Sequence, residues 1–340
     1  MTIREIAKAA GVSPATVSLV LNNKPGVSNE RRQKIQRLLQ QSGYEKRSSE
    51  KSSFNVLFIK YVQYGTIVEH NGDFINRVLD GLQDEADRLK INLTMRNVNS
   101  HHFEEIFDSI NTGGYHGLIV LGTELDDAFA KKLDDVSIHT VVLDNMVENY
   151  ELDSVVMDNR GGAYAGVRYL IENGHSAIGF VKSKYDISNF SLRYEGYRSA
   201  LEHYGIKFDE KYVFEVEPTM HGAYHDMLNA LSKGRQLPSG FFAANDSMGA
   251  GVVKALKQYS YRIPEQVSMV GIDDLPFCSI SDPMLTTMAI PKEMMGKLAM
   301  KRIHDKILNN ETECLKQLVC PYLVKRESVS KWNGTLPPRP

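Results

Sequence analysis

The 340-residue sequence predicts two structural parts: a small all-α head with a helix-turn-helix, and a larger α/β core of two doubly wound parallel-sheet subdomains. Three observations lead to this prediction. Two short helical patterns flank a Gly-Val-Ser turn near the start, and positive charge is concentrated in the same stretch. Further along, an alternation of strands and helices begins a second time.

The head is predicted from its helix start and stop signals. Apolar residues at helical spacing precede Gly11, which ends the first helix as a C-cap. Ser13 is a suitable N-cap for a second helix, and Pro14 suits its first position. A third helix is expected between Ser28 and Gly43. Two short helices joined by a tight turn form a helix-turn-helix, whose second helix can enter the DNA major groove.

The charge distribution supports a nucleic-acid partner for the head. Residues 1–51 hold ten Lys and Arg against four Glu, a net charge of about +6, so the remaining chain carries about −8. A basic arm on an acidic body is typical of nucleic-acid binding. The alternative interpretation is a solvated basic surface.

The core is predicted from its repeated strands, such as "GLIVLG" and "TVVLDN", which alternate with amphipathic helices. The alternation of strands and helices begins again at "AIGFV", which indicates two subdomains that face one cleft. Polar residues end several strands: Asp144, then Asn245 with Asp246, then Asp273 with Asp274. Such residues either hydrogen-bond a ligand or cap the following helix, and both interpretations stay open.

Composition and missing motifs argue against several protein classes. Cys278, Cys314 and Cys320 have no metal-ligand spacing, and His101–His102 is an adjacent pair rather than an i, i+4 pair. We find no phosphate-binding loop, no nucleophile elbow and no zinc-protease motif. No secretory signal or long apolar segment is evident. The expectation is therefore a cytoplasmic protein that is not an enzyme, with no cofactor and no bound metal.

The opening stretch "IREIAKAAGVSPATVSLVLNN", followed by "VSNERRQKIQRLLQQSGY", resembles the DNA-binding head of the LacI/GalR-type (lactose-repressor) family of bacterial regulators. The specific part is Gly-Val-Ser-x-x-Thr-Val-Ser. The resemblance implies a DNA-binding set with base edges facing Pro14, Ala15, Thr16 and Leu19, and phosphates near Thr2, Ser13, Ser18 and Asn22. Pro14, Ala15 and Leu19 lack side-chain hydrogen-bonding groups, so we expect contacts to thymine methyl groups and weak base discrimination.

The resemblance extends over the core, where "AANDSMGAG" and "VGIDDLPF" are close to the family pattern. It implies a periplasmic-binding-protein-like core, with Arg193 clamping an effector and Asp273 contacting it. Arg193 offers paired donors to vicinal hydroxyls or a carboxylate, with a surface salt bridge as the alternative. Tyr61, Tyr64, Phe74 and Phe190 are expected in loops or at helix starts, where a sugar ring could stack, although core packing is the expectation for Phe74. The candidate effector-binding set is Arg193, Asn245, Asp273, Asp144, Tyr61 and Phe190.

The resemblance also implies the domain plan, with one departure. The linker "EKRSSEKSSF" lacks the Pro, the Ala-Arg pair and the wedge Leu of the usual hinge helix, which puts strong operator bending in doubt. The predicted parts are a head (1–44), an atypical hinge (45–53), a core (54–330) and a tail (331–340). Within the core, we expect an amino-terminal subdomain of about 54–156 and 290–318, and a carboxyl-terminal subdomain of about 157–289 and 319–330.

Together these features predict a ligand-responsive transcriptional repressor that binds a pseudo-palindromic DNA operator as a homodimer and is controlled by a small sugar. The tail is too short for a tetramerising heptad helix. One alternative is a regulator with a nucleobase or phosphometabolite corepressor, which Lys182 and Lys184 keep open. Another is a cytoplasmic sugar sensor with a weakened DNA-binding head.

Overall fold

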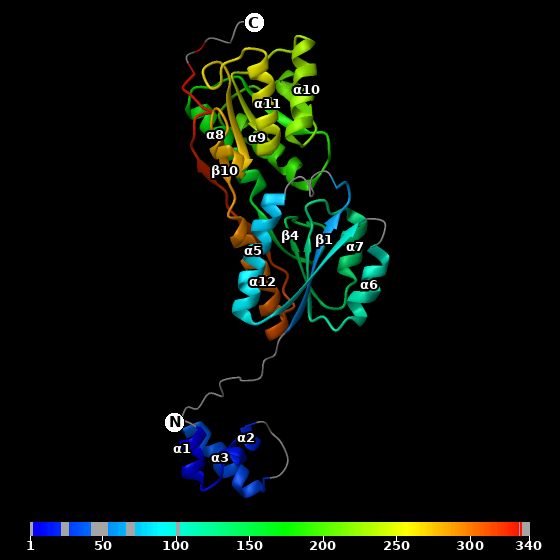
Figure 1. Ribbon diagram of the computed structural model, residues 1–340, viewed down its shortest axis with the longest axis vertical. Helices are drawn as coiled ribbons and strands as arrows, with labels where there is room; N and C mark the ends of the chain where they lie inside the picture. The colour runs from blue at the N-terminus through cyan, green and yellow to red at the C-terminus, as the bar shows by residue number, and fades with distance from the viewer. Residues whose placement is uncertain are drawn as a thin grey trace. The chain divides into compact units, whose positions relative to one another are not determined.

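A computed structural model describes residues 3–21, 27–41, 54–65, 72–99, 103–332 and 334 (Figure 1). The chain divides into two compact units, Met1–Ser52 and Ser53–Pro340. The described residues of the first unit form helices without strands, and the second unit contains two separate, mainly parallel sheets with helices, so the predicted fold class is confirmed. The linker predicted at 45–53 lies outside the described residues.

The described residues of the head form three helices, α1 (Ile3–Ala10), α2 (Pro14–Leu21) and α3 (Asn29–Gln41). Gly11 takes a φ of +70° and ends α1, as a residue without Cβ can do at little cost. The Ser13 hydroxyl accepts a 3.2 Å hydrogen bond from the Thr16 amide and so caps α2. Ile6, Val17 and Ile35, one from each helix, are fully buried and form the centre of a small core.

The first sheet of the core has six strands, and every neighbouring pair is parallel. Its strands, in spatial order, are β11 (Lys316–Val319), β5 (Asp153–Met157), β4 (His139–Leu143), β3 (Gly117–Leu121), β1 (Asn55–Val62) and β2 (Asn92–Asn99). The accompanying helices are α5 (Gly72–Leu89), α6 (Phe103–Thr112), α7 (Asp127–Asp134) and α12 (Lys292–Asn309). Strands β3 and β5 are buried along their whole length, as expected when helices cover both faces of a parallel sheet.

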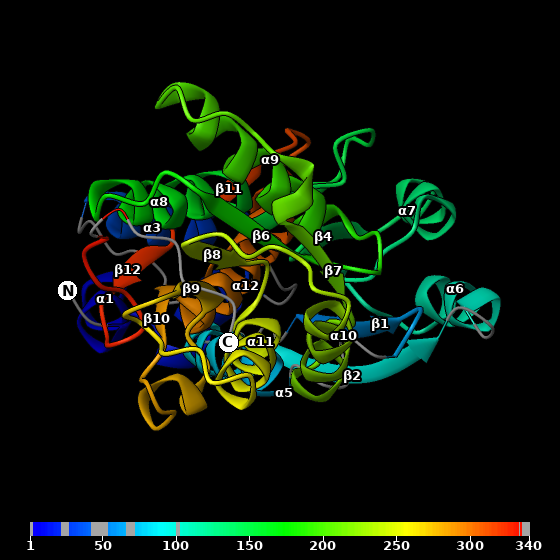
Figure 2. The same ribbon diagram turned by 90° about the horizontal axis from the view of Figure 1, so that it is seen from above.

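The second sheet also has six strands, and only its edge strand β12 runs antiparallel. Its strands, in spatial order, are β12 (Tyr322–Val324), β10 (Thr286–Ala289), β9 (Ser268–Asp273), β8 (Gly240–Ala243), β6 (Ile178–Ser183) and β7 (Val213–Val216). Helices α8 (Asn159–Glu172) and α9 (Ser188–His203) lie on one side, and α10 (Met220–Ser232) and α11 (Asp246–Gln258) on the other (Figure 2). Two 3₁₀ helices, Glu210–Tyr212 and Pro276–Ser279, complete this part.

The chain passes between the two sheets three times: after β5, after β10 and after β11. As a result, α12 follows a strand of the second sheet but packs against α5 beside the first (Figure 1). The two helices approach closely because Gly81 and Gly296 have no Cβ. A Cβ atom on Gly81 would lie 2.0 Å from the Glu293 carbonyl oxygen, and one on Gly296 would lie 2.1 Å from that of Val78. Within the described part of the chain, no helix has the length and apolar character needed to span a membrane.

Candidate functional site

A closed pocket lies between the two sheets, where the carboxyl ends of several strands meet. Its volume is about 30 Å³, which is space for only one or two water molecules. The lining residues come from both halves of the core: Phe74, Thr123, Asp144, Met157, Ile187, Asn189, Phe190, Arg193, Pro218, Asn245, Ser247 and Asp273. Five of the six predicted effector residues are therefore brought together, and Tyr61 is the exception.

Arg193, from α9, is the central cation of this pocket and is only 3% exposed. Its Nε donates to Asn159 Oδ1 at 2.8 Å, and Nη1 donates to the carbonyl oxygen of Ala244. Its Nη2 lies 3.3 Å from Asp273 Oδ1 and 3.0 Å from the sulfur of Met157. The guanidinium is thus held in one orientation by groups from both sheets, rather than forming a surface salt bridge.

Asp273 ends β9 and is the ion-pair partner of Arg193. It takes a φ of +124°, and the next residue, Asp274, takes a φ of +55°. Backbone conformations of this kind are unfavourable for residues with a Cβ and are frequent at functional sites. Burial raises the pKa of Asp273 to about 7, although the nearby Arg193 opposes the shift by favouring the carboxylate.

Asp144 directly follows β4 and occupies the corresponding place in the first sheet, also with a positive φ of +66°. Its Oδ2 accepts a 2.6 Å hydrogen bond from the Thr123 hydroxyl. Its Oδ1 is buried and has no hydrogen-bond partner. Burial raises the pKa of this carboxyl to about 6, because desolvation disfavours the charged form, although Thr123, Arg193 and Asn189 oppose the shift. The pocket therefore contains a buried acceptor that a ligand with an O–H or N–H group could satisfy.

Asn245 lines the pocket but also caps a helix. Its Oδ1 accepts a 2.7 Å hydrogen bond from the Met248 amide at the start of α11, and its Nδ2 lies 3.4 Å from the carbonyl oxygen of Pro218. The neighbouring Asp246 is fully buried and accepts hydrogen bonds from Thr287, Cys278 and the Leu275 amide. The capping interpretation thus holds for Asn245, and Asp246 ties together the segments around β9.

Three polar residues that line the pocket were not predicted from the sequence: Thr123, Asn189 and Ser247. Asn159, which accepts from Arg193 behind the lining, was not predicted either. The Asn159 amide donates to Asn189 Oδ1 at 2.9 Å, and the Asn189 amide donates to the carbonyl oxygen of Asp144 at 3.0 Å. This last bond links α9 of the second half to β4 of the first. Thr123 follows β3 as Asp144 follows β4, so its position after a strand is the signal that could have identified it.

Tyr61 requires a correction, because it lies inside β1 and not in a loop. Residues at alternate positions of a strand face the same side, so Tyr61 packs with Leu57 and Ile59 in a cluster away from the pocket. Its ring lies 4.4 Å from that of Phe129, and its hydroxyl donates to Asp126 at 2.9 Å. These contacts explain its complete burial, and we withdraw it from the candidate set.

Of the remaining predicted residues, the two phenylalanines line the pocket and the two lysines form ion pairs elsewhere. Phe74 and Phe190 line the pocket, and the Arg193 guanidinium carbon lies 5.7 Å from the centre of the Phe190 ring. Lys182 pairs with Glu215 at 3.2 Å, and Lys184 pairs with Asp226 at 2.8 Å; neither lysine lines the pocket.

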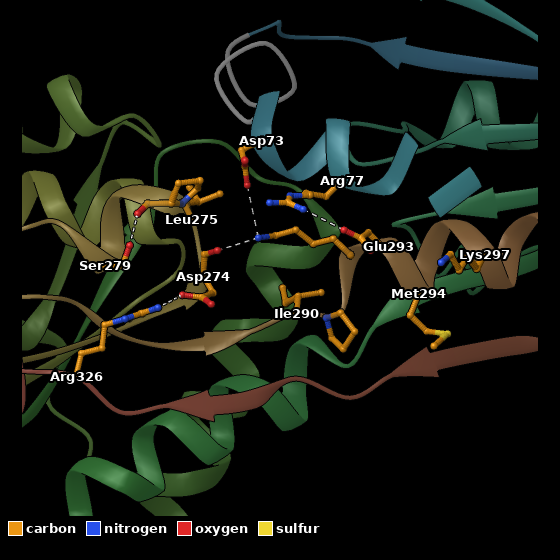
Figure 3. Close-up of a pocket in the computed structure, with 13 residues that line it drawn as sticks. Asp73, Arg77, Asp274, Leu275, Ser279, Ile290, Glu293, Met294, Lys297 and Arg326 are labelled. Atoms are coloured by element: carbon orange, nitrogen blue, oxygen red, sulfur yellow. Dashed lines mark hydrogen bonds and ion pairs between the residues drawn. The ribbon is translucent and has the colours of Figure 1, made fainter. Parts of the chain in front are cut away.

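A second, more open cavity of about 540 Å³ contains a network of paired charges (Figure 3). Arg326 contacts Asp274 at 2.6 Å, and Arg77 contacts Glu293 at 3.1 Å. The Lys292 ammonium donates to the Asp274 carbonyl oxygen at 2.9 Å. This network joins α5 to α12, and α12 to Asp274, the residue that directly follows β9.

In the head, the candidate DNA-contacting residues centre on α2. Ser13 and Pro14 are exposed at its start, and Thr16 and Leu19 are half-buried along it. The backbones of Ala15 and Ser18 belong to the same helix. Thr2 and Asn22 lie outside the described residues.

Comparison with known proteins gives consistent matches along the chain. Residues 2–46 match "Bacterial regulatory proteins, lacI family" and residues 167–329 match "Periplasmic binding protein-like domain". The HTH-type transcriptional regulator GalS of Salmonella typhimurium is 30% identical over 335 residues, which cover 97% of each chain.

Two solved structures share the fold. A transcriptional regulator CelR–cellobiose complex has a TM-score of 0.73 and 24% identity, covering 96% of this chain and 99% of its own. The lac repressor dimer bound to operator and the anti-inducer ONPF has a TM-score of 0.71 and 22% identity, covering 97% of this chain and 99% of its own. The chain therefore belongs to the LacI family of bacterial regulatory proteins, as a DNA-binding transcriptional regulator with an effector-binding core.

Proposed function

We propose that this regulator is a repressor whose operator affinity is controlled by a small, uncharged, polyhydroxylated molecule, a sugar or sugar derivative, bound in the pocket between the two sheets. The observation that carries the proposal is the partnerless Oδ1 of Asp144 in a pocket that also holds Arg193 and Asp273. A sugar hydroxyl can donate to Asp144 and accept from Arg193, so one ligand class satisfies both groups. A cellobiose complex among the structures that share the fold supports this class.

The charge balance of the pocket favours a neutral ligand over a phosphorylated one. Asp144 and Asp273 face a single guanidinium, and Lys182 and Lys184 are paired elsewhere. A phosphate about 5 Å from either carboxylate would experience a repulsion of roughly 3 kcal/mol at an effective dielectric constant near 20. The phosphometabolite alternative therefore lacks the cations it would need.

Ligand binding requires the pocket to widen, because a volume of about 30 Å³ does not admit a sugar ring. The contacts that would break first join the two halves: Asn189 to the Asp144 carbonyl oxygen, and Arg193 to the sulfur of Met157. A ligand that binds the open arrangement more tightly shifts the equilibrium between the two arrangements. We infer that this shift controls operator affinity through reciprocal linkage between ligand and DNA.

A homodimer is part of the proposal and is supported by an exposed apolar groove on the second half of the core. Ile280 is 83% exposed and Met220 is 39% exposed. They border a groove of about 510 Å³ with Val253, Phe277 and Leu285. Exposed apolar surface of this kind marks protein contacts, and a dimer would place two α2 helices on the two half-sites of an operator. We expect Ile280→Glu to convert the dimer to a monomer in light scattering, with Ser279→Glu as the exposed control.

The DNA-binding set is also proposed: Thr2, Ser13, Pro14, Ala15, Thr16, Ser18, Leu19 and Asn22. We further propose that the protein acts in the cytoplasm and catalyses no reaction.

The experiment that tests the proposal is selection of binding sites from a random duplex pool, followed by titration of the selected operator. A pseudo-palindromic consensus and a linear fall of log affinity with log salt concentration are expected. Neutral sugars, their phosphate esters and purine bases are then compared for their effect on operator affinity. A response confined to phosphate esters or to bases would contradict the proposal, and bases are included because Phe74 and Phe190 line the pocket. Absence of any selected sequence would favour a sensor with a weakened head.

A further inference from the structure

Lys316, the first residue of β11, lies at the centre of four backbone carbonyl oxygens from one turn. Its Nζ is 2.9 Å from the Met146 oxygen, 3.1 Å from that of Val147, 3.1 Å from that of Tyr150 and 2.7 Å from that of Leu152. An ammonium group has three N–H donors, so four acceptors exceed what it can bond individually. Among the described residues, no carboxylate forms an ion pair with Lys316, so the four carbonyl oxygens are the groups that receive its hydrogen bonds.

The distances from the Lys316 Nζ to these four oxygens, 2.7–3.1 Å, suit a large monovalent cation at the same position. Oxygen ligands lie 2.0–2.1 Å from Mg²⁺ and 2.3–2.6 Å from Ca²⁺, both of which are shorter than the distances here. Rings of backbone carbonyls that replace a hydration shell are instead the usual ligands of K⁺. The turn 146–152 thus has the form of a cation cage whose cation is supplied by the chain itself.

The turn also stores backbone strain next to the pocket. Asp144 takes a φ of +66° and the β-branched Val147 takes a φ of +45°. A left-handed conformation is a genuine outlier for a β-branched residue and persists only where the surroundings impose it. The Asn145 side chain contributes by accepting from the Val147 amide at 3.0 Å and donating to the Gly122 oxygen at 3.0 Å. Without a cation, the four converging carbonyls would repel one another and favour release of this strain.

We propose that the turn 146–152 is a monovalent-cation site occupied by the Lys316 ammonium, which acts as a positioning residue for Asp144. The role of Asp144 as a ligand contact rests on the proposed function, whereas the cation site does not. Lys316 is exposed as a residue, so an ion from solvent can reach the site once the side chain is removed.

The test is ion-selective rescue of Lys316→Met, which keeps the length of the side chain but removes its charge. The matched control is Lys182→Met, since Lys182 is an exposed lysine with a single ion pair. The full-length proteins are melted in KCl, NH₄Cl, LiCl and tetramethylammonium chloride at equal ionic strength. We expect the midpoint of the core transition in Lys316→Met to fall by roughly 2–6 °C in the lithium and tetramethylammonium salts. K⁺ and NH₄⁺ should restore at least half of this loss, and Lys182→Met should show no such selectivity.

Amide hydrogen exchange read by mass spectrometry locates the effect. Exchange in the peptide that spans 144–152 should become at least tenfold faster in Lys316→Met and slow again in K⁺. An unchanged midpoint, or a loss that all four salts alter equally, would overturn the proposal. If Lys316→Met does not accumulate in folded form, Lys316→Gln, which keeps two N–H donors without charge, is measured by the same criteria. Neither readout involves DNA or an effector, so failure here is distinguishable from failure of the proposed function.

Discussion

Asp144 and Asp273 occupy corresponding places in the two halves of the core, yet their carboxylates have different hydrogen-bond and ion-pair partners. Asp273 is the last residue of the central strand β9 and Asp144 directly follows the central strand β4; both have a positive φ and both are buried. Asp273 receives the guanidinium of Arg193, whereas Asp144 receives one hydroxyl from Thr123 and keeps an oxygen without a partner. The comparison teaches that the fold pairs one carboxylate with a cation and leaves an oxygen of the other without a hydrogen-bond partner, and it is this oxygen that we propose a ligand satisfies.

The largest expected effect on the free energy of unfolding comes from Arg193→Met, which removes the cation that pairs with Asp273. Both partners of the Arg193–Asp273 pair are only 4% exposed at their side chains, so removing the cation leaves Asp273 buried either as an unpaired carboxylate or as a protonated acid that the unfolded state does not favour at pH 7. We expect the free energy of unfolding of the core to fall by about 3–5 kcal/mol in urea denaturation at pH 7. Arg193→Met/Asp273→Asn should recover about 1–3 kcal/mol, since the unpaired charge is gone. A single variant within 1 kcal/mol of the wild type would contradict this account.

The second prediction concerns the effect of Asp144 on the pH dependence of stability. Because the folded state raises the pKa of Asp144 to about 6, it binds the proton more tightly than the unfolded state does. The stability contributed by the protonated group is fully present below about pH 4 and is lost as the pH rises to 6. The wild type should therefore lose roughly 3 kcal/mol relative to Asp144→Asn between pH 4 and pH 7. Urea denaturation at several pH values measures the difference, with the exposed Asp134→Asn as control. A pH-independent difference would refute the prediction.

A smaller effect is expected from Thr123→Val, which removes the hydroxyl bonded to Asp144 with little change in shape. A second carboxylate oxygen would then lose its donor in a buried site. We expect a loss of about 1–3 kcal/mol at pH 7 that shrinks toward pH 4, where Asp144 is protonated. Chemical denaturation at both pH values tests this, and an equal loss at pH 4 and pH 7 would show that the bond does not favour the carboxylate.

The smallest effect is expected outside the pocket, from Tyr61→Phe. This change removes one hydrogen bond to Asp126 and leaves the ring in place against Phe129. Stability should fall by about 0.5–1.5 kcal/mol, and the response of operator affinity to effector should be unchanged. A lost effector response with intact stability would return Tyr61 to the binding set.

The sequence predicted those pocket residues whose position follows from the local pattern of strands. Parallel strands end at one edge of a sheet, so Asp144, Asn245 and Asp273 could be expected to converge on a cleft. Tyr61 departs from the prediction because its period-two relation to Leu57 and Ile59 places it on the same face of β1, in a cluster away from the pocket. That relation was present in the sequence.

Other features depend on tertiary packing and could not be predicted. Asn159 and Asn189 are 30 residues apart and meet because α8 packs against α9. The partnerless oxygen of Asp144 and the four carbonyls around Lys316 depend on atomic positions that no sequence pattern specifies. The domain boundaries and the DNA-contacting residues stay predictions.

The most direct test of the central claim measures operator affinity by fluorescence anisotropy for the wild type and Asp144→Asn, across a panel of neutral sugars and their phosphate esters. We predict that at least one neutral sugar changes wild-type operator affinity by tenfold or more. We also predict that Asp144→Asn keeps its sugar-free operator affinity but loses that response. A variant that responds like the wild type, or a wild type that responds only to phosphate esters, would contradict the claim that Asp144 is left for a neutral ligand.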